Sequence, residues 1–273
     1  MAKTKTMNSL INANRTKLIL GIIGIIAIGG IMFFSCTEEK KDFKNYNSKS
    51  NSNYSQQTNY VGKKHNQLCD FFNKNFSFVN NPDLKPISTK DFIEWTMASK
   101  SFFLQLGYTK NEIDKTIDGV LTFLNQFKDN PVTGESTLME KLKTTNDIVL
   151  MACNTPDFSP KLKSYLLALN QLARDTNSLQ SDVDKIIKQI ETLPPSYEKA
   201  LTLDVYYHSK EYWTNFNLCN SKDHNPGGMG DAEWQIICDT IGAIYGTSFG
   251  VFGSILVGGL MSWAVANSQR RMA

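Results

Sequence analysis

The chain has 273 residues, of which 41% are hydrophobic and 20% are charged, and its formal net charge is +3. The first 35 residues carry four positive charges and no negative charge, so the rest of the chain has a formal net charge of −1. Nucleic-acid-binding proteins concentrate Lys and Arg on one face, and this balance argues against nucleic acid as a partner.

Residues 1–35 have the layout of a secretory signal. A basic head ending at Lys17 is followed by an apolar run from Leu18 to Phe34, which only glycines and one alanine interrupt. Cys36 follows directly, and the segment resembles the lipoprotein signals of Bacteroidota, in which this cysteine is lipidated and becomes the first mature residue. The resemblance implies lipidation at Cys36 and a location in the bacterial cell envelope, at the outer membrane, in the periplasm or on the surface.

The same apolar run leaves a second interpretation open. At about 17 residues it is just long enough to cross a bilayer core of about 30 Å as an uncleaved helix. The protein would then be a bitopic or two-span membrane protein without a lipid anchor.

Residues 36–61 are expected to form a disordered tether. From Thr37 to Tyr60 there is no aliphatic residue, and such a segment cannot bury enough surface to offset the entropy of ordering. A flexible chain of this length would hold the folded part on the order of 25–30 Å from its anchor. The acidic pair Glu38–Glu39 resembles the signals that send some Bacteroidota lipoproteins to the cell surface.

Residues 62–219 are expected to form a helical domain, because apolar positions recur every three and four residues. Short connections favour an all-α fold, an irregular antiparallel bundle. The helices predicted from periodicity, caps and breakers cover residues 66–76, 89–106, 110–124, 137–152, 160–172, 183–190 and 196–216.

Four of these helices have recognisable start signals. Ser88 or Thr89 is expected to cap the second helix. Thr109 with Glu112, and Thr137 with Glu140, have the spacing of a capping box. Ser159–Pro160 combines a cap with a first-turn proline.

No catalytic or metal-binding motif is present in the sequence. There is no phosphate-binding glycine loop, nucleophile elbow or zinc-protease motif. His208 and Glu211 lie one turn apart and read as an ordinary helix face, and Cys219, His224 and Cys238 match no usual zinc spacing. We therefore expect no metal, no cofactor and no enzymatic activity, with a helical enzyme of unrecognised site as the alternative.

Lipidation of one cysteine would leave an even number of others. Cys69, Cys153, Cys219 and Cys238 would then remain in a compartment that permits disulfides. Two bridges or four buried thiols both fit this pattern. Among the pairings, Cys219 with Cys238 is favoured, because the glycine-rich loop between them can turn back.

The carboxyl end consists of a flexible loop at 220–231 and an apolar tail at 232–273. Nine of the 17 glycines lie beyond residue 226, and residues 240–269 contain no charged side chain. Small residues recur every fourth position and would form one stripe on a helix, where they permit close helix packing; they are Gly242, Gly246, Gly250, Ser254 and Gly258.

Each glycine inside a helix costs about 0.8–1.0 kcal/mol relative to alanine, so the stripe has to pack against something. Three environments stay open. The tail forms a helix or helical hairpin that packs on the domain, or it inserts in a membrane, or it is a membrane-active, bacteriocin-like toxin element. A straight helix over 241–266 would measure about 39 Å, with Asp239 at one membrane interface and Arg270–Arg271 at the other.

The last 70 residues resemble the ending of uncharacterised exported proteins of Bacteroidota. Those proteins pair a Ser-x-x-Tyr-Trp helix, here Ser209–Trp213, with an Asp-x-x-Gly-Ala-x-x-Gly glycine zipper, here Asp239–Gly246. Tyr245 and Phe249 replace small zipper residues. The resemblance implies no activity, so we expect an envelope lipoprotein that acts as an interaction or structural protein with an unknown protein partner.

Overall fold

The computed structural model describes residues 60–76, 86–154, 158–175, 178, 180–220 and 231–269, apart from the side chains of 216–220, 231 and 269. The predicted signal, Cys36 and the tether lie outside this part of the chain, as does most of the predicted loop at 220–231. The described residues belong to one compact unit, Ser50–Ala273.

The described part of the chain is helical, which confirms the all-α class. The only β-type pairing among the described residues is an isolated bridge between Asp129 and Ser136. The helices are α3 (Val61–Asn75), α4 (Thr89–Gln105), α5 (Lys110–Leu124), α6 (Thr137–Thr144), α7 (Asp147–Ala152), α8 (Pro160–Arg174), α9 (Gln180–Glu191), α10 (Tyr197–Asn220), α11 (Asp231–Gly246) and α12 (Gly250–Gln269).

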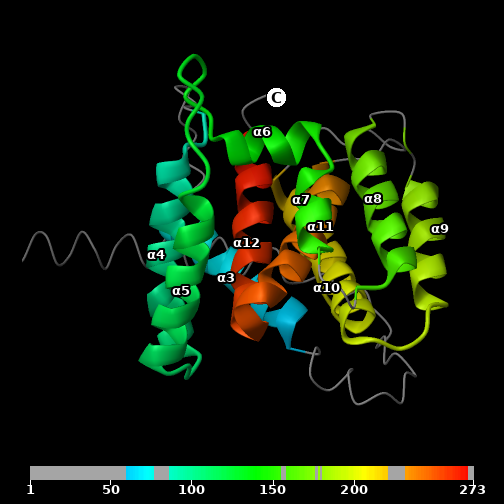
Figure 1. Cartoon of the computed structure of the whole chain (residues 1–273), viewed down its shortest axis with the longest axis horizontal. Helices are drawn as coiled ribbons and strands as arrows, with labels where there is room; N and C mark the ends of the chain where they lie inside the picture. The colour runs from blue at the N-terminus through cyan, green and yellow to red at the C-terminus, as the bar shows by residue number, and fades with distance from the viewer. Residues whose placement is uncertain are drawn as a thin grey trace, which may run out of the picture. The chain divides into compact units, whose positions relative to one another are not determined.

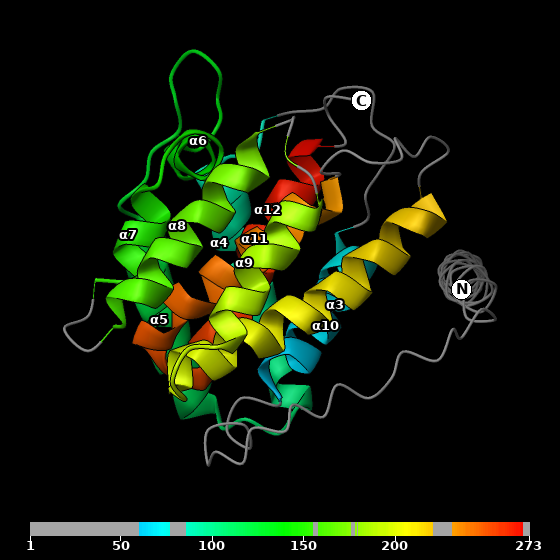
Figure 2. The same cartoon turned by 90° about the vertical axis from the view of Figure 1, so that its right-hand side faces the viewer.

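The carboxyl-terminal helices form a hairpin at the centre of the domain. Figure 1 shows α12 between the α4–α5 pair and the group of α7, α10 and α11. Helices α3, α4 and α5 pack on α12, while α7, α8 and α10 pack on α11. Figure 2, turned by 90°, shows α3 lying beside α10. Of the three environments left open for the tail, the structure therefore has the helical hairpin packed on the domain, which encloses it.

The hairpin turn lies where one straight helix was an alternative. A short 3₁₀ segment, Thr247–Phe249, separates α11 from α12, and Gly250 has a φ of 82°. This left-handed conformation is open to glycine and strained for other residues. Gly250 thus forms the turn and has no neighbour at its Cβ position, so its expected place in the packing stripe is wrong.

The backbones of α11 and α12 touch at the small residues. A Cβ on Gly242 would lie 2.9 Å from the carbonyl oxygen of Val257 and 3.0 Å from Cα of Gly258. A Cβ on Gly246 would overlap the carbonyl of Gly253 and come within 2.6 Å of Cα of Ser254. Only glycine fits at such contacts, so these positions fix the separation of the two helices.

The hairpin is apolar enough to suit a membrane as well as a protein core. The run Ala232–Ser268 is long and apolar enough to cross a membrane, a test that the core helices of soluble proteins also pass. In this structure 83% of its most apolar window is buried inside the domain.

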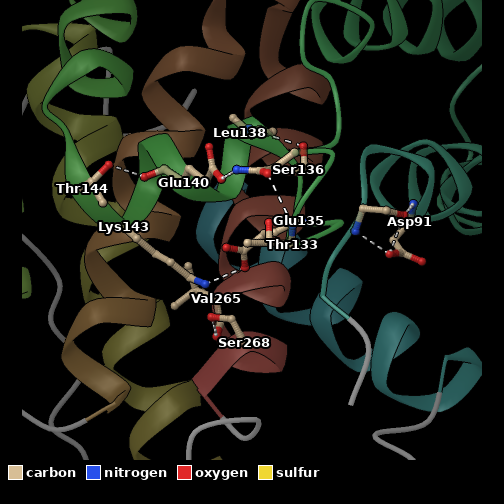
Figure 3. Close-up of polar contacts among 12 residues, drawn as sticks. Asp91, Thr133, Glu135, Ser136, Leu138, Glu140, Lys143, Thr144, Val265 and Ser268 are labelled. Atoms are coloured by element: carbon tan, nitrogen blue, oxygen red, sulfur yellow. Dashed lines mark hydrogen bonds and ion pairs between the residues drawn. The ribbon is translucent and has the colours of Figure 1, made fainter. Parts of the chain in front are cut away.

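Most of the predicted helix starts are confirmed. Ser88 caps α4 in a capping box with Asp91, and Thr109 caps α5 in a box with Glu112. Ser159 caps α8 with a proline in the first turn. The box predicted at Thr137 is wrong, because Ser136 is the cap and its hydroxyl accepts from the backbone N–H of Leu138 (Figure 3).

The predicted helix over 137–152 is two helices, α6 and α7. Thr145 is extended between them, and Asn170 of α8 donates its amide to the carbonyl of Thr145 and to the side chain of Asn146. Arg174 also donates to Asn146, at 2.7 Å. Hydrogen bonds from α8 therefore stabilise the break between α6 and α7, which the spacing of apolar residues in 137–152 does not indicate.

Replacing Gly246 with alanine tests the close approach of the hairpin. Alanine favours helix by about 1 kcal/mol over glycine, yet overpacking against backbone costs typically about 1–3 kcal/mol or more. We expect Gly246→Ala to lower the free energy of unfolding, measured by urea denaturation. The matched control is Gly119→Ala in α5, where only the rotatable ring of Phe249 stands in the way. Equal stability of Gly246→Ala and wild type would contradict the contact.

Candidate functional site

Three helices meet at one buried carboxylate, that of Asp239 in α11. Nε2 of His65, from α3, lies 2.8 Å from one carboxylate oxygen, and neither side chain has any exposed surface. The indole N–H of Trp213, from α10, donates to the other oxygen at 2.7 Å. We call these three residues the latch, because they join the hairpin to the two helices that cover it.

The electrostatics of the latch follow from this geometry. Burial alone lowers the pKa of His65, but the Asp239 carboxylate and Cys69 outweigh it, so the pKa is raised well above its ordinary value. The raised pKa favours the protonated ring, which forms an ion pair with the carboxylate of Asp239. Its second nitrogen, Nδ1, lies 3.0 Å from the side-chain oxygen of Asn66, which accepts the remaining N–H.

Cys69 completes the surroundings of His65 without forming a nucleophile. Its sulfur lies 3.7 Å from Nε2 of His65, but burial raises the pKa of the thiol to about 11. The reactive form of cysteine is the thiolate, which this environment disfavours. A cysteine, a histidine and an aspartate also form the active sites of some cysteine proteases. Here the raised pKa keeps Cys69 as a thiol, so the three side chains serve packing.

The glycine contacts and the latch depend on each other. A Cβ on Gly258 would lie 3.2 Å from Cδ2 of His65 and 3.1 Å from the carbonyl oxygen of Asp239. The missing side chain therefore gives the imidazole its place against α12, and the site is filled with protein atoms. Within the described residues no cluster of three or more His, Cys, Asp and Glu side chains has an arrangement that could hold a metal ion.

Helices α3 and α10, which carry His65 and Trp213 of the latch, are joined by a ladder of three hydrogen bonds. The partners recur every fourth residue on both helices, which shows that the two helices run parallel and in fixed register. The bonds are Gly62 N–H to Asp204, the Asn66 amide to the carbonyl of His208, and the Tyr212 hydroxyl to Asp70, each at 2.9 Å. A Cβ on Gly62 would lie 2.7 Å from the backbone oxygen of Asp204, so this end of the ladder needs glycine.

His208 serves the ladder rather than a site with Glu211. Its Nδ1 lies 2.9 Å from the backbone oxygen of Asp204 and 3.3 Å from the Asp204 carboxylate. The hydrogen bond to Asp204 raises the pKa of His208, against the effect of burial, and Glu211 adds a smaller charge effect. The acidic partner of His208 is thus Asp204, one turn before it, and not Glu211, one turn after it.

The cysteines are not bridged in the described structure. Cys69, Cys153 and Cys238 are buried free thiols, so the structure does not contain the favoured bridge between Cys219 and Cys238. The reason is that Cys238 faces the interior of the domain from α11, where burial raises its pKa. The side chain of Cys219 and all of His224 lie outside the described residues.

The sequence patterns did not predict the contact between His65, Trp213 and Asp239, although the position of Asp239 indicates that it needs a partner. Asp239 would lie at a membrane interface only if the tail spanned a membrane as one straight helix, whereas the structure places it in the core with no exposed surface. A lone carboxylate at the edge of a charge-free run requires a buried partner. His65, on the same helix face as Leu68 and Phe72, is the histidine that answers this requirement.

Comparisons with protein-family models, with curated proteins and with solved structures found no match for this chain. Function therefore has to be inferred from the sequence and the geometry.

Removing the carboxylate of Asp239 tests how much the latch contributes to the free energy of unfolding. Breaking a buried ion pair by deleting one partner costs about 3–5 kcal/mol, because the other charge stays buried. We expect Asp239→Ala to lose that much free energy of unfolding in urea. The control, Lys185→Gln, breaks an exposed pair with Asp182 and should cost about 1 kcal/mol or less.

The double variant His65→Ala/Asp239→Ala should lose less than the sum of the two single variants, because neither charge is then left alone. Additive losses would contradict a direct pair.

The pH dependence of the ladder has a defined sign. The pKa of His208 is raised on folding, so its contribution is fully present below about pH 6.5, the ordinary value, and is lost as pH rises through the raised value. The difference in free energy of unfolding between wild type and His208→Gln should shrink from acid to alkaline pH. Because His208 is partly exposed, we expect an effect on the order of 1 kcal/mol or less.

Glu211→Gln is the control for this measurement, since it keeps the Asp204 contact and should leave the pH profile nearly unchanged. A difference between wild type and His208→Gln that grows with pH would refute the assignment.

Proposed function

We propose that this protein is a lipid-anchored protein of the bacterial cell envelope, which acts by binding a protein partner rather than by catalysis. The observation that carries the proposal is the enclosure of the α11–α12 hairpin in the domain core. The chain has two apolar segments that could attach it to a membrane, and the carboxyl-terminal one is buried in the domain core. This favours the amino-terminal segment, with Cys36, as the membrane attachment.

Lipidation is a sufficient anchor in physical terms. Each buried methylene contributes about 0.8 kcal/mol, and two or more acyl chains hold a protein stably on a membrane. The tether predicted for residues 36–61 would then separate the domain from the bilayer. No hydrophobic surface of the domain would be needed for attachment.

A role in binding is supported by an ordered turn that presents an apolar tip. Val132 is 90% exposed in the segment between α5 and α6. Asn130 accepts hydrogen bonds from the backbone of Val132 and Thr133 and donates to Glu140 at 2.7 Å, and Lys143 pairs with Glu135 at 2.6 Å (Figure 3). Because the turn is already ordered, contact with a partner would cost little conformational entropy.

The sealed latch also favours this interpretation over catalysis. The His65–Asp239 pair has no exposed surface, and a catalytic group has to reach its substrate. The ion pair is better explained as a device that fixes the packing of three helices.

Replacing Cys36 with alanine tests the anchor. In a host that processes lipoproteins, we expect Cys36→Ala to lose incorporation of labelled fatty acid and, because the unprocessed chain keeps the apolar run 18–34, to have a larger mass than the processed wild type. Ser35→Ala is the matched control, because it changes the adjacent small residue and keeps the thiol. The other four cysteines are present in both variants, so label on them would be visible. Full membrane retention of Cys36→Ala at unchanged mass would instead identify an uncleaved spanning helix.

A further inference from the structure

We propose that the domain docks on the anionic headgroups of a phospholipid bilayer through the end at which the chain enters α3. The inference rests on the proposed attachment of the amino-terminal segment to the membrane. It holds equally for a lipid on Cys36 and for an uncleaved apolar helix, because both precede Tyr60 in the chain.

Exposed apolar side chains gather at this end of the domain. Figures 1 and 2 show the start of α3, the end of α4 and the start of α12 at its lower end. These segments carry Tyr60, Leu104 and Val251, which are 61%, 53% and 42% exposed. They are three of the six exposed large hydrophobic side chains among the described residues. We define the entry patch as Tyr60, Lys64, Leu104, Tyr108 and Val251.

Direct contacts make the entry patch one surface. Nζ of Lys64 donates to the hydroxyl of Tyr108 at 3.2 Å and lies 4.8 Å from the centre of the Tyr108 ring and 6.0 Å from that of Tyr60. The ring of Tyr108 stacks on that of Phe252 at 5.5 Å between centres, and Phe252 follows Val251 in α12. Because this packing fixes the side chains before any contact, docking would cost little conformational entropy.

The residue types of the entry patch suit the interface of a membrane. Tyrosine is enriched at membrane interfaces, and lysine keeps its ammonium group among headgroups while its stem covers apolar surface. Lys63 and Lys110, which are exposed, add positive charge beside the patch. Glu112 and Asp204 adjoin it too, but each carboxylate accepts a backbone N–H of the domain at 2.9 Å. The lysines therefore complement anionic headgroups, which attract such side chains near the surface.

The point at which the chain enters the domain identifies a bilayer as the occupant. Tyr60 of the patch is preceded directly by the tether predicted for residues 36–61, which leads back to the proposed anchor. A tether with a span on the order of 25–30 Å keeps the patch near the membrane at an effective concentration on the order of millimolar. A weak contact with headgroups is then populated, whereas a free protein partner has no such advantage at this end.

Docking through the entry patch would also orient the domain. Figures 1 and 2 show the segment between α5 and α6 at the opposite end of the domain. This segment carries Val132, the exposed tip that supports a role in binding. The docked domain would therefore present that tip away from the bilayer, where a partner can reach it.

Short-range fluorescence quenching tests the docking. The full chain with its native Cys36 is produced in a host that processes lipoproteins. It is reconstituted into vesicles of phosphatidylethanolamine and phosphatidylglycerol that carry a spin label on the headgroup. A fluorophore is attached to an added cysteine at an exposed position, either Gln105→Cys beside the patch or Val132→Cys at the opposite end. The chain without an added cysteine gives the background from native thiols.

We expect quenching of the probe at position 105 to exceed that at position 132 by about threefold or more, because docking holds this end at the headgroups. The tether by itself also brings this end nearer to the bilayer, so variants of the patch decide between the two causes.

Leu104→Ser/Val251→Ser removes exposed apolar surface from the patch and should lower quenching at position 105 by about threefold or more. Met97→Ser/Leu150→Ser is the matched control, since these side chains are 45% and 42% exposed outside the patch. The control should change quenching by less than about 1.5-fold. Circular dichroism and urea denaturation verify that each variant is folded.

The charge of the patch gives an independent arm. Lys63→Gln/Lys110→Gln should lower quenching at position 105 by about threefold or more, because each lysine near an anionic surface strengthens binding several-fold. Replacing phosphatidylglycerol with phosphatidylcholine should have the same effect on the parent chain.

Flotation of the vesicles separates failure of the docking from failure of the attachment. The docking is overturned, and the attachment stands, if the chain floats with the vesicles but the probes at 105 and 132 are quenched alike. It is also overturned if the apolar and lysine variants of the patch leave quenching unchanged. A chain that does not float overturns the attachment and the docking together.

Discussion

The packing of this domain depends on one carboxylate that has no access to water. An isolated ionised carboxylate in a protein interior is prohibitively unfavourable, so Asp239 can be buried only where a cation and a further donor reach it. His65 and Trp213 supply these from two other helices. The pair need not add net stability, since its desolvation cost offsets the Coulombic gain. What it does is penalise every arrangement in which α3, α10 and α11 are out of register.

The glycines of the hairpin serve the same constraint. Gly258 leaves the space in which the ring of His65 lies, and Gly242 lets α12 approach α11 closely enough to line that space. Side chains at these positions would separate the helices and move the histidine away from the carboxylate. The small-residue stripe, which reads as a generic packing device in the sequence, therefore also sets the geometry of the ion pair.

The features that the sequence predicted depend on contacts between residues close together in the chain, whereas those it did not predict depend on contacts between distant residues. The all-α class and the caps at Ser88, Thr109 and Ser159 follow from interactions within a turn of helix, which a single sequence contains. The break between α6 and α7 depends on Asn170 and Arg174 from α8, which local periodicity does not include. The ladder joins residues 142 apart, and such an offset leaves no mark in composition or spacing. The position of Asp239 at the edge of an apolar run indicates that it needs a buried partner, but nothing in the sequence pattern identifies that partner as His65.

The sequence left the environment of the tail open, because a protein core and a bilayer favour similar apolar helices. An apolar helical hairpin with internally bonded hydroxyls satisfies the demands of a protein core and of a bilayer alike. Each glycine costs about 0.8–1.0 kcal/mol of helix propensity, and at Gly242, Gly246 and Gly258 a side chain would collide with, or press closely on, the facing helix or His65. Direct contact between backbones is most useful where no hydrophobic effect drives helices together. In this fold the same contacts hold α12 against α11 and leave the space in which the ring of His65 lies beside Asp239.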